Sequence, residues 1–210
     1  TYDISIKLNP KNALAISQKG HAYGLNGDIK KASELYKQAL KVNPLLEHAI
    51  ANYGKILLQE GKNNEAEIYM KSIFEISSNR RLQAEAGQLL GVLSLYKGDF
   101  AVAKNYFEKA IAIDKNLASA WVGIAEIEYL TLGKDPINFS NNIIHIFRNI
   151  ERATQINPNQ TTAYLLAGKT LLLVGDKKQA RGVLEKAIEK VSEDITLGVA
   201  EKESILIEIK

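Results

Sequence analysis

The amino-acid sequence repeats itself with a period of 34 residues, and this self-similarity constrains the fold more than any single motif does. Pro10 and Pro44 lie 34 residues apart, as do Gly27 and Gly61, and the interval lengthens by three residues between Gly61 and Gly98. A unit of this length is too short to bury a hydrophobic core of its own. We therefore expect successive units to stack, each packing only on its neighbours, in an elongated array.

The stretch from residue 84 to residue 116 shows what one unit contains. Its first half carries small and apolar residues at three- and four-residue spacing, which predicts a helix with one buried face. Gly98 accepts the left-handed backbone common at a helix C-terminus, and we expect Asp99 to cap the next helix by accepting hydrogen bonds from its free amides. A second amphipathic helix follows, with Phe100, Ala103, Phe107, Ala110, Ile111 and Ile113 as its predicted buried stripe.

The other segments place the same residue types at equivalent positions. The first helix carries a small residue at Gly20, Gly54, Gly91, Ala125 and Gly168. The turn carries Gly27, Gly61, Gly98 and Gly175, and the second helix carries Ala32, Ala66, Ala103 and Ala180, followed by Tyr36, Met70, Phe107 and Leu184. Small residues let two helices approach closely, so we expect Gly54 and Gly91 to lie where helices nearly touch.

These positions resemble the tetratricopeptide repeat family, whose signature runs from a bulky residue through a Leu-Gly pair, a Tyr, an Ala, a Phe or Tyr and an Ala to a closing Pro. The matching residues are Trp121 or Tyr164, Leu90-Gly91, Ala167-Gly168, Tyr23, Pro10, Pro44 and Pro158. The departures from the signature are Lys19, Ser78, Lys115 and Ser192. The resemblance implies an all-α fold, an α–α superhelix (solenoid) of about five helix–turn–helix repeats with a half repeat and a C-terminal capping helix.

The register sets the expected boundaries of the units. They are a half repeat as N-terminal cap (1–12), repeats at 13–46, 47–83, 84–117, 118–160 and 161–194, and a capping helix at 195–210. Three extra residues near residue 80 either prolong a helix or lengthen a turn. In the fourth repeat we expect residues 133–141 to form a loop, either a plain surface extension or a lip on a groove, before a helix from about 142 to 156. Apolar ends lead us to expect a fragment of a longer protein.

Composition excludes several classes of function. The chain has no cysteine, which rules out disulfides, thiolate catalysis and cysteine-based metal sites. The net charge is +3 with acids and bases interspersed, so we do not expect a nucleic-acid partner. The longest apolar stretches are too short for a membrane span or are broken by Lys169, so we do not expect direct membrane insertion.

No arrangement of residues predicts catalysis, a cofactor or a metal site. His21, His48 and His145 fall on three different repeats and have no carboxylates at metal-ligand spacing. The Gly168-Lys169-Thr170 triplet matches the end of a phosphate-binding loop, but it sits inside a predicted helix whose amides are already committed. We therefore expect a protein that is not an enzyme.

In the family that this sequence resembles, the first helices line a concave groove. The resemblance places thirteen side chains in a peptide-binding groove: Gln18, His21, Asn52, Lys55, Gln88, Val92, Tyr96, Val122, Glu126, Tyr129, Leu165, Leu166 and Lys169. The first two repeats contribute polar residues and the last three contribute mostly apolar ones. The family's clamp for a C-terminal carboxylate is matched only at Asn52, so docking of heat-shock chaperone tails is not expected.

The interpretation that follows is a protein–protein interaction module, a scaffold or adaptor that holds a peptide or amphipathic helix. We expect Tyr96, Tyr129 and Leu166 to anchor the partner, and Lys55, Glu126 and Lys169 to set its register. Two alternatives remain open at this point. One is a non-catalytic repeat region of a larger enzyme or secretion or assembly machine, such as a glycosyltransferase or an exporter, and the other is self-association into a homo-oligomer.

Overall fold

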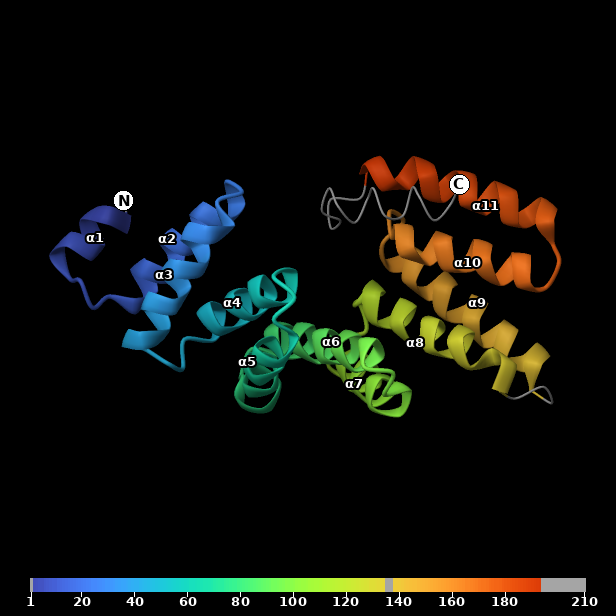
Figure 1. The fold of residues 1–210 in the computed structure, drawn as a ribbon, viewed down its shortest axis with the longest axis horizontal. Helices are drawn as coiled ribbons and strands as arrows, with labels where there is room; N and C mark the ends of the chain where they lie inside the picture. The colour runs from blue at the N-terminus through green and yellow to red at the C-terminus, as the bar shows by residue number, and fades with distance from the viewer. Residues whose placement is uncertain (1, 135–137, 194–210) are drawn as a thin grey trace. The chain divides into compact units, whose positions relative to one another are not determined.

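The computed structural model describes residues 2–134 and 138–193 and shows helical hairpins in tandem (Figure 1). No β-strand occurs within these two ranges, as predicted for an all-α chain. The helices are α1 (Tyr2–Leu8), α2 (Ala13–Leu25), α3 (Ile29–Val42), α4 (Glu47–Gln59), α5 (Asn63–Ile76), α6 (Arg80–Tyr96), α7 (Phe100–Ile113), α8 (Ala118–Thr131), η1 (Leu132–Lys134, a 3-10 turn), α9 (Phe139–Ile156), α10 (Thr161–Leu173) and α11 (Lys177–Glu193). The capping helix expected at 195–210 lies outside the described residues.

The chain divides into two compact units at residue 93, within α6. In the first unit α2 pairs with α3 and α4 pairs with α5, while α1 packs on α2 and α3 packs on α4. The core of this unit contains Ile16, Tyr36 and Leu57, none more than 2% exposed. At its edge the rings of Tyr53 and Tyr69 meet edge to face, with centroids 5.2 Å apart. Hydrophobic burial between neighbouring helices therefore holds this unit together.

The second unit repeats the arrangement with α8 paired to α9 and α10 paired to α11 (Figure 1). α7 packs on α8, and α9 packs on α10. Its core includes Val122, Ile146, Ile150 and Leu166, all 6% exposed or less. These side chains come from α8, α9 and α10, so the core is shared between successive hairpins.

Each described hairpin turn is closed by the same main-chain motif. Gly27 has φ of 81° and Gly98 has φ of 79°, the left-handed region that glycine enters without strain. The Asp28 amide donates to the Tyr23 carbonyl (2.9 Å), and the Gly27 amide donates to the Gly24 carbonyl (3.0 Å), which is the Schellman pattern. The same pair of bonds closes the turns at Gly61, Gly98 and Gly175. The predicted turn glycines are therefore confirmed.

The capping role expected of Asp99 is wrong. Asp99 lies at the N-cap of α7, but its side chain makes no capping hydrogen bond there. At the equivalent positions of other turns, Asp28 accepts from the Lys31 amide (3.1 Å) and Asp176 accepts from the Gln179 amide (3.0 Å). The turn therefore forms with or without the side-chain cap, because its main-chain bonds are the same.

The small residues of the first helices lie against large side chains sixteen positions later. A β-carbon added at Gly54 would collide with the Met70 methyl group, and one added at Gly168 would lie 2.6 Å from Leu184 Cγ. The prediction of a close approach at Gly54 is confirmed. In the fourth repeat Gly123 of α8 faces the buried ring of Phe107 on α7, and Ala125 is fully buried. Gly91 is buried as well.

The two departures from the 34-residue period are absorbed differently. The three extra residues near residue 80 lengthen α6, which begins at Arg80 and has 17 residues, whereas α2 and α4 have 13 each. In the fourth repeat α9 begins at Phe139 rather than near residue 142, so the loop is shorter than expected. Phe139 and Ile143 pack on the core of the second unit, and this contact explains the earlier start.

We predict that Gly123→Ala destabilises the protein. The new methyl group would lie 2.6 Å from a ring carbon of Phe107, and this ring is fully buried. The expected cost is about 1–3 kcal/mol in free energy of unfolding, measured by urea denaturation followed by circular dichroism.

Gly182→Ala in α11 is the matched control, since nothing lies within 4 Å of a β-carbon at that position. This substitution should stabilise the helix by about 0.5–1 kcal/mol. Equal stability of the two variants would contradict the close helix contact at Gly123.

Candidate functional site

The first helices of the first unit carry the polar part of the expected groove. Gln18 and His21 are exposed on α2, and Asn52 is half-buried on α4, where it is hydrogen-bonded with the hydroxyl of buried Tyr36. Gln88 and Val92, both on α6, are half-buried. The polar side chains among them can contact a ligand through hydrogen bonds, and Val92 adds one apolar group.

An ion-pair network joins α4 to α6 in this unit. Lys55 Nζ lies 2.7 Å from Glu85 Oε2, and Arg81 Nε lies 3.1 Å from Glu85 Oε1, so both carboxylate oxygens are engaged. Lys55 is therefore tied to a neighbouring repeat, whereas the sequence suggested that it sets the register of a partner. The pairing could have been anticipated, because Lys55 and Glu85 both occupy first-helix positions of adjacent repeats.

In the second unit, several residues expected to line a groove are core residues instead. Val122 and Leu166 are each 6% exposed and belong to the cluster formed by α8, α9 and α10. Leu165 is also buried. The anchoring role expected of Leu166 is therefore wrong, because its side chain is enclosed by the adjacent hairpins. The spacing of residues along one helix could not reveal this contact, which depends on the neighbouring repeats.

The other predicted residues of the second unit lie at the surface. Tyr96 at the end of α6 is 80% exposed, Glu126 is exposed, and Tyr129 and Lys169 are half-buried. Three leucines near the C-terminal ends of α8 and α10 are about half exposed: Leu130, Leu172 and Leu173. α8 and α10 pack on each other. We call the surface formed by Glu126, Tyr129, Leu130, Lys169, Leu172 and Leu173 the α8–α10 face.

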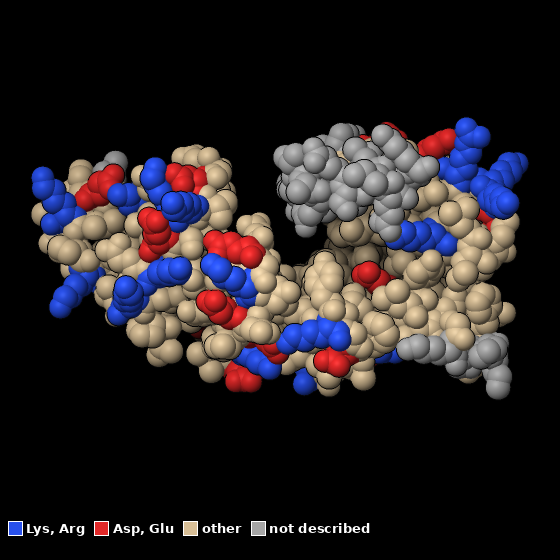
Figure 2. Space-filling model, viewed as in Figure 1, with Lys and Arg blue, Asp and Glu red and all other residues tan. Residues whose placement is uncertain are grey.

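The α8–α10 face pairs equivalent positions of two repeats. Glu126 and Lys169 are 43 residues apart, and so are Leu130 and Leu173, which is the interval between the two repeats. Tyr129 packs partly on the core cluster, which fixes its ring. The face therefore combines apolar side chains with one acidic and one basic group. On the side of each unit in view in Figure 2, acidic and basic side chains are interspersed.

The described residues contain no group of three or more histidine, cysteine, aspartate or glutamate side chains that could hold a metal ion. Within the same residues, none of the helices combines the length and the apolar character needed to cross a membrane. The first helices of the first unit carry hydrogen-bonding groups and one ion-pair network, and those of the second unit carry partly exposed leucines. Hydrogen bonding can hold a ligand on the first surface, and burial can hold one on the second.

The family model that describes the tetratricopeptide repeat matches three segments of the chain, residues 14–44, 47–80 and 84–117. These segments correspond to the α2–α3, α4–α5 and α6–α7 hairpins. The chain belongs to the tetratricopeptide repeat family. The fold class and the family expected from the sequence are thereby confirmed.

Two curated relatives are similar to the chain over part of their length. The chain is 21% identical over 165 residues to anaphase-promoting complex subunit 3 of Schizosaccharomyces pombe, covering 79% of this chain and 23% of that protein. It is 27% identical over 128 residues to the type IV pilus assembly protein PilF of Pseudomonas aeruginosa, covering 60% of this chain and 49% of PilF. The chain thus spans less than half of each relative.

Solved structures share the fold. The structure of Pseudomonas aeruginosa PilF superposes with a TM-score of 0.73 at 18% identity, covering 99% of this chain and 86% of that chain. YrrB, described as a tetratricopeptide repeat protein with an unusual peptide-binding site, gives a TM-score of 0.62 at 15% identity, covering 90% and 92%. Tetratricopeptide repeat proteins are typically non-catalytic scaffolds, which supports a protein-interaction or scaffold module as the coarse function of this chain.

Two carboxyl groups of this tetratricopeptide chain titrate in opposite directions. Burial pushes the pKa of Glu85 upward, but the hydrogen bond and charge of Lys55, together with Arg81, outweigh it and hold that pKa below the ordinary 4.5. Burial raises the pKa of Glu128 above 4.5, although the Asn149 amide donates to its carboxylate at 2.9 Å and Lys104 and His145 oppose the shift. Protonation thus favours the folded state at Glu128 and disfavours it at Glu85.

We predict that Glu128→Gln gains stability relative to the wild type as the pH rises. The folded wild type holds the Glu128 proton more tightly than the unfolded chain does, so its contribution is present below pH 4.5 and is lost as the pH rises through the raised pKa. Glutamine retains an oxygen for Asn149 and has no charge to desolvate. The change should stay below about 1 kcal/mol because the group is half-buried, measured by urea denaturation across pH 4–8.

Glu85→Gln is the control with the opposite sign. Its carboxylate stabilises the folded state above pH 4.5 and loses this effect as the pH falls through the lowered pKa, so this variant should be weakest near neutrality. Parallel pH profiles of the two variants would contradict these assignments.

Proposed function

We propose that the chain is a non-enzymatic module that holds another polypeptide on the first helices of its repeats, with the α8–α10 face as the main apolar contact. The observation that carries this proposal is the group of half-exposed leucines at the ends of two adjacent first helices, Leu130, Leu172 and Leu173. Exposed apolar patches bordered by polar residues are typical of interaction sites. The apolar side of an amphipathic helix suits such a surface.

The supporting elements are rigid. Tyr129 is packed against the core, and α10 contributes Leu166 and Ala167 to the same core and pairs with α11. A receptor that is ordered before binding loses little conformational entropy when the partner arrives. The affinity would then come from a few buried anchors surrounded by polar contacts, with Tyr129 and the leucines as anchors.

The charged groups of this face, Glu126 and Lys169, lie at equivalent positions of α8 and α10, and both already interact within the chain. They would border the apolar contact rather than supply the affinity. The polar first helices of the first unit, with Gln18, His21 and Asn52, form a surface of their own that suits a hydrophilic ligand. Tyr96, which is highly exposed, is a further candidate contact.

A second candidate is favoured by the comparison with PilF. That protein is named for the assembly of type IV pili, and the other curated relative is a subunit of the anaphase-promoting complex. One name describes a subunit of a complex and the other a protein of pilus assembly, so a non-catalytic role in a larger assembly agrees with the proposal. This favours an assembly role over attachment to an enzyme such as a glycosyltransferase. Self-association through the same face would give a mass that rises with concentration in light scattering.

The test is a double variant, Leu172→Lys with Leu173→Lys. Both side chains are about half exposed, and cations suit the last turn of a helix, so the fold should be retained within about 0.5 kcal/mol. Partner capture should weaken by at least about tenfold, because each leucine would lose contact area worth about 1.5–3 kcal/mol when fully buried. The measurement is affinity capture from the native lysate with quantitative mass spectrometry.

Val102→Lys is the matched control, because Val102 is 49% exposed on α7 of the same unit and lies outside the α8–α10 face. It should capture the same proteins as the wild type. Unchanged capture by the double lysine variant would exclude the α8–α10 face as the contact surface.

A further inference from the structure

A cavity opens between α9, α10 and α11 in the second unit, away from the α8–α10 face. Its volume is about 370 Å³, and it is lined by Phe147, Ile150, Thr154, Tyr164, Ala167, Leu171, Gln179 and Val183. Tyr164, Ala167 and Leu171 share one side of α10, whereas Lys169 and Leu173 of the α8–α10 face project from other positions around that helix. The cavity therefore belongs to a different surface of the same unit.

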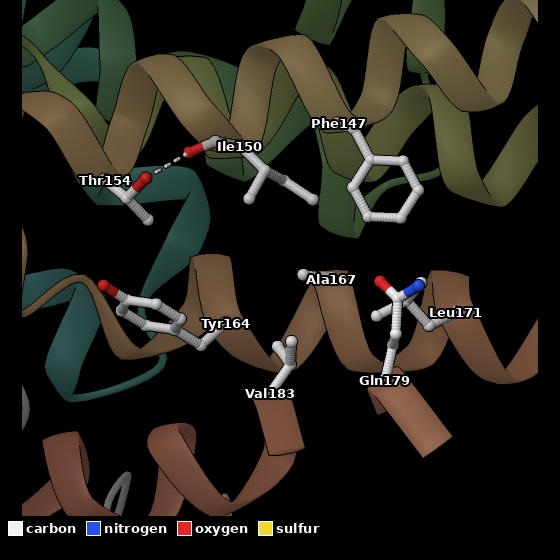
Figure 3. A pocket seen from close by; sticks show the side chains of 8 residues that line it. All are labelled: Phe147, Ile150, Thr154, Tyr164, Ala167, Leu171, Gln179 and Val183. Carbon is white, nitrogen blue, oxygen red and sulfur yellow. Dashed lines mark hydrogen bonds between the residues drawn. The ribbon is translucent and has the colours of Figure 1, made fainter. Parts of the chain in front are cut away.

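The middle of the cavity is apolar and owes its space to a small residue. Ile150, Ala167 and Val183 come from the three helices and point into the gap between them (Figure 3). The methyl group of Ala167 fills little of the space between α9 and α11, so the gap between these two helices stays open. The volume lies near the lower end of the range for ligand pockets, about 300–1,000 Å³. It suits one ring system rather than several residues of a peptide.

Thr154 and Tyr164, each with a hydroxyl group, line one end of the cavity (Figure 3). The Thr154 hydroxyl donates its proton to the Ile150 carbonyl (3.1 Å) or the Glu151 carbonyl (3.0 Å), and the Tyr164 hydroxyl donates to the Pro158 carbonyl (2.9 Å). Each hydroxyl has one proton, and that proton is committed to the backbone. Towards a ligand, both oxygens can therefore only accept hydrogen bonds.

The other end of the cavity is formed by Phe147, Leu171 and Gln179 (Figure 3). An aromatic ring in the cavity could meet the Phe147 ring in the offset or edge-to-face geometry that aromatic pairs prefer. None of the eight lining residues carries a charge, so the cavity offers no compensation to an ion that loses its water. The ligand must therefore be neutral.

We propose that this cavity is a second binding site and that it receives a tryptophan side chain of another polypeptide. The indole ring fills the apolar middle, and its single N–H donates to the acceptor oxygen of either Thr154 or Tyr164. A phenylalanine or leucine side chain would cover these oxygens without supplying a donor, which is unfavourable. The inference rests on the proposed function only in taking a polypeptide as the ligand.

The experiment uses N-acetyl-tryptophanamide as a probe, titrated into the whole chain and followed by amide chemical shifts in NMR. We expect saturable shifts at Thr154, Tyr164 and Val183. The benzothienyl analogue of the same amide has the same shape without the N–H and should bind several-fold more weakly. Shifts that do not saturate, or equal binding of the two probes, would overturn the proposal.

Val183→Phe should abolish probe binding by filling the cavity with its own ring. Val102→Phe on α7 is the matched control and should bind the probe as the wild type does. Probe binding by a folded Val183→Phe chain, judged by circular dichroism, would contradict the site.

Tyr164→Phe gives an independent test, because this variant loses the acceptor oxygen. It should show a smaller preference for the tryptophan probe over its analogue. An unchanged preference would contradict the role of this oxygen.

The two binding proposals can fail separately. The Leu172→Lys, Leu173→Lys variant should bind the tryptophan probe normally while losing partner capture, since its substitutions lie outside the cavity. Loss of probe binding in that variant would contradict a separate site.

Discussion

The close contact between a small residue on a first helix and a large side chain on the second helix determines the geometry of each hairpin. Gly54 against Met70 and Gly168 against Leu184 show the same sixteen-residue relation in different units. Backbones that approach this closely bury the remaining apolar stripe of both helices, and hydrophobic burial then joins one hairpin to the next. The ligand-binding surfaces that we propose depend on this packing, because it leaves the first and second helices with separate exposed sides.

Much of the fold could be predicted because its determinants are local and repeated. The turn glycines and the alanine positions follow from a period that is visible along the chain, and the structure reproduces them at Gly27, Gly61, Gly98 and Gly175. Predictions that depended on contacts between repeats were less accurate. Leu166 has the spacing of a groove residue, but neighbouring hairpins enclose it. The ion pair of Lys55 with Glu85 and the early start of α9 at Phe139 likewise depend on side chains distant in sequence.

The candidate sites differ in how far sequence reasoning could reach them. Tyr129 and Glu126 were expected from the family resemblance, and the half-exposed leucines beside them follow from the same helix positions. The cavity between α9, α10 and α11 could not have been expected, since it arises where Ala167 leaves space between two helices that belong to different repeats. The space beside a small residue cannot be recognised in a sequence until the positions of the surrounding helices are known. The two surfaces would allow one unit to engage a polypeptide at two separate points.

The hairpin turns also explain how the repeats could diverge. Both hydrogen bonds of each turn join main-chain atoms. A glycine at the tip is therefore the one residue type that the turn requires. The residue after it is Asp28, Lys62, Asp99 or Asp176, and the turn closes identically with a basic or an acidic side chain. Mutations can therefore accumulate beside the glycine without altering the connection between the helices. In such a chain, surface chemistry can evolve independently of architecture, one repeat at a time.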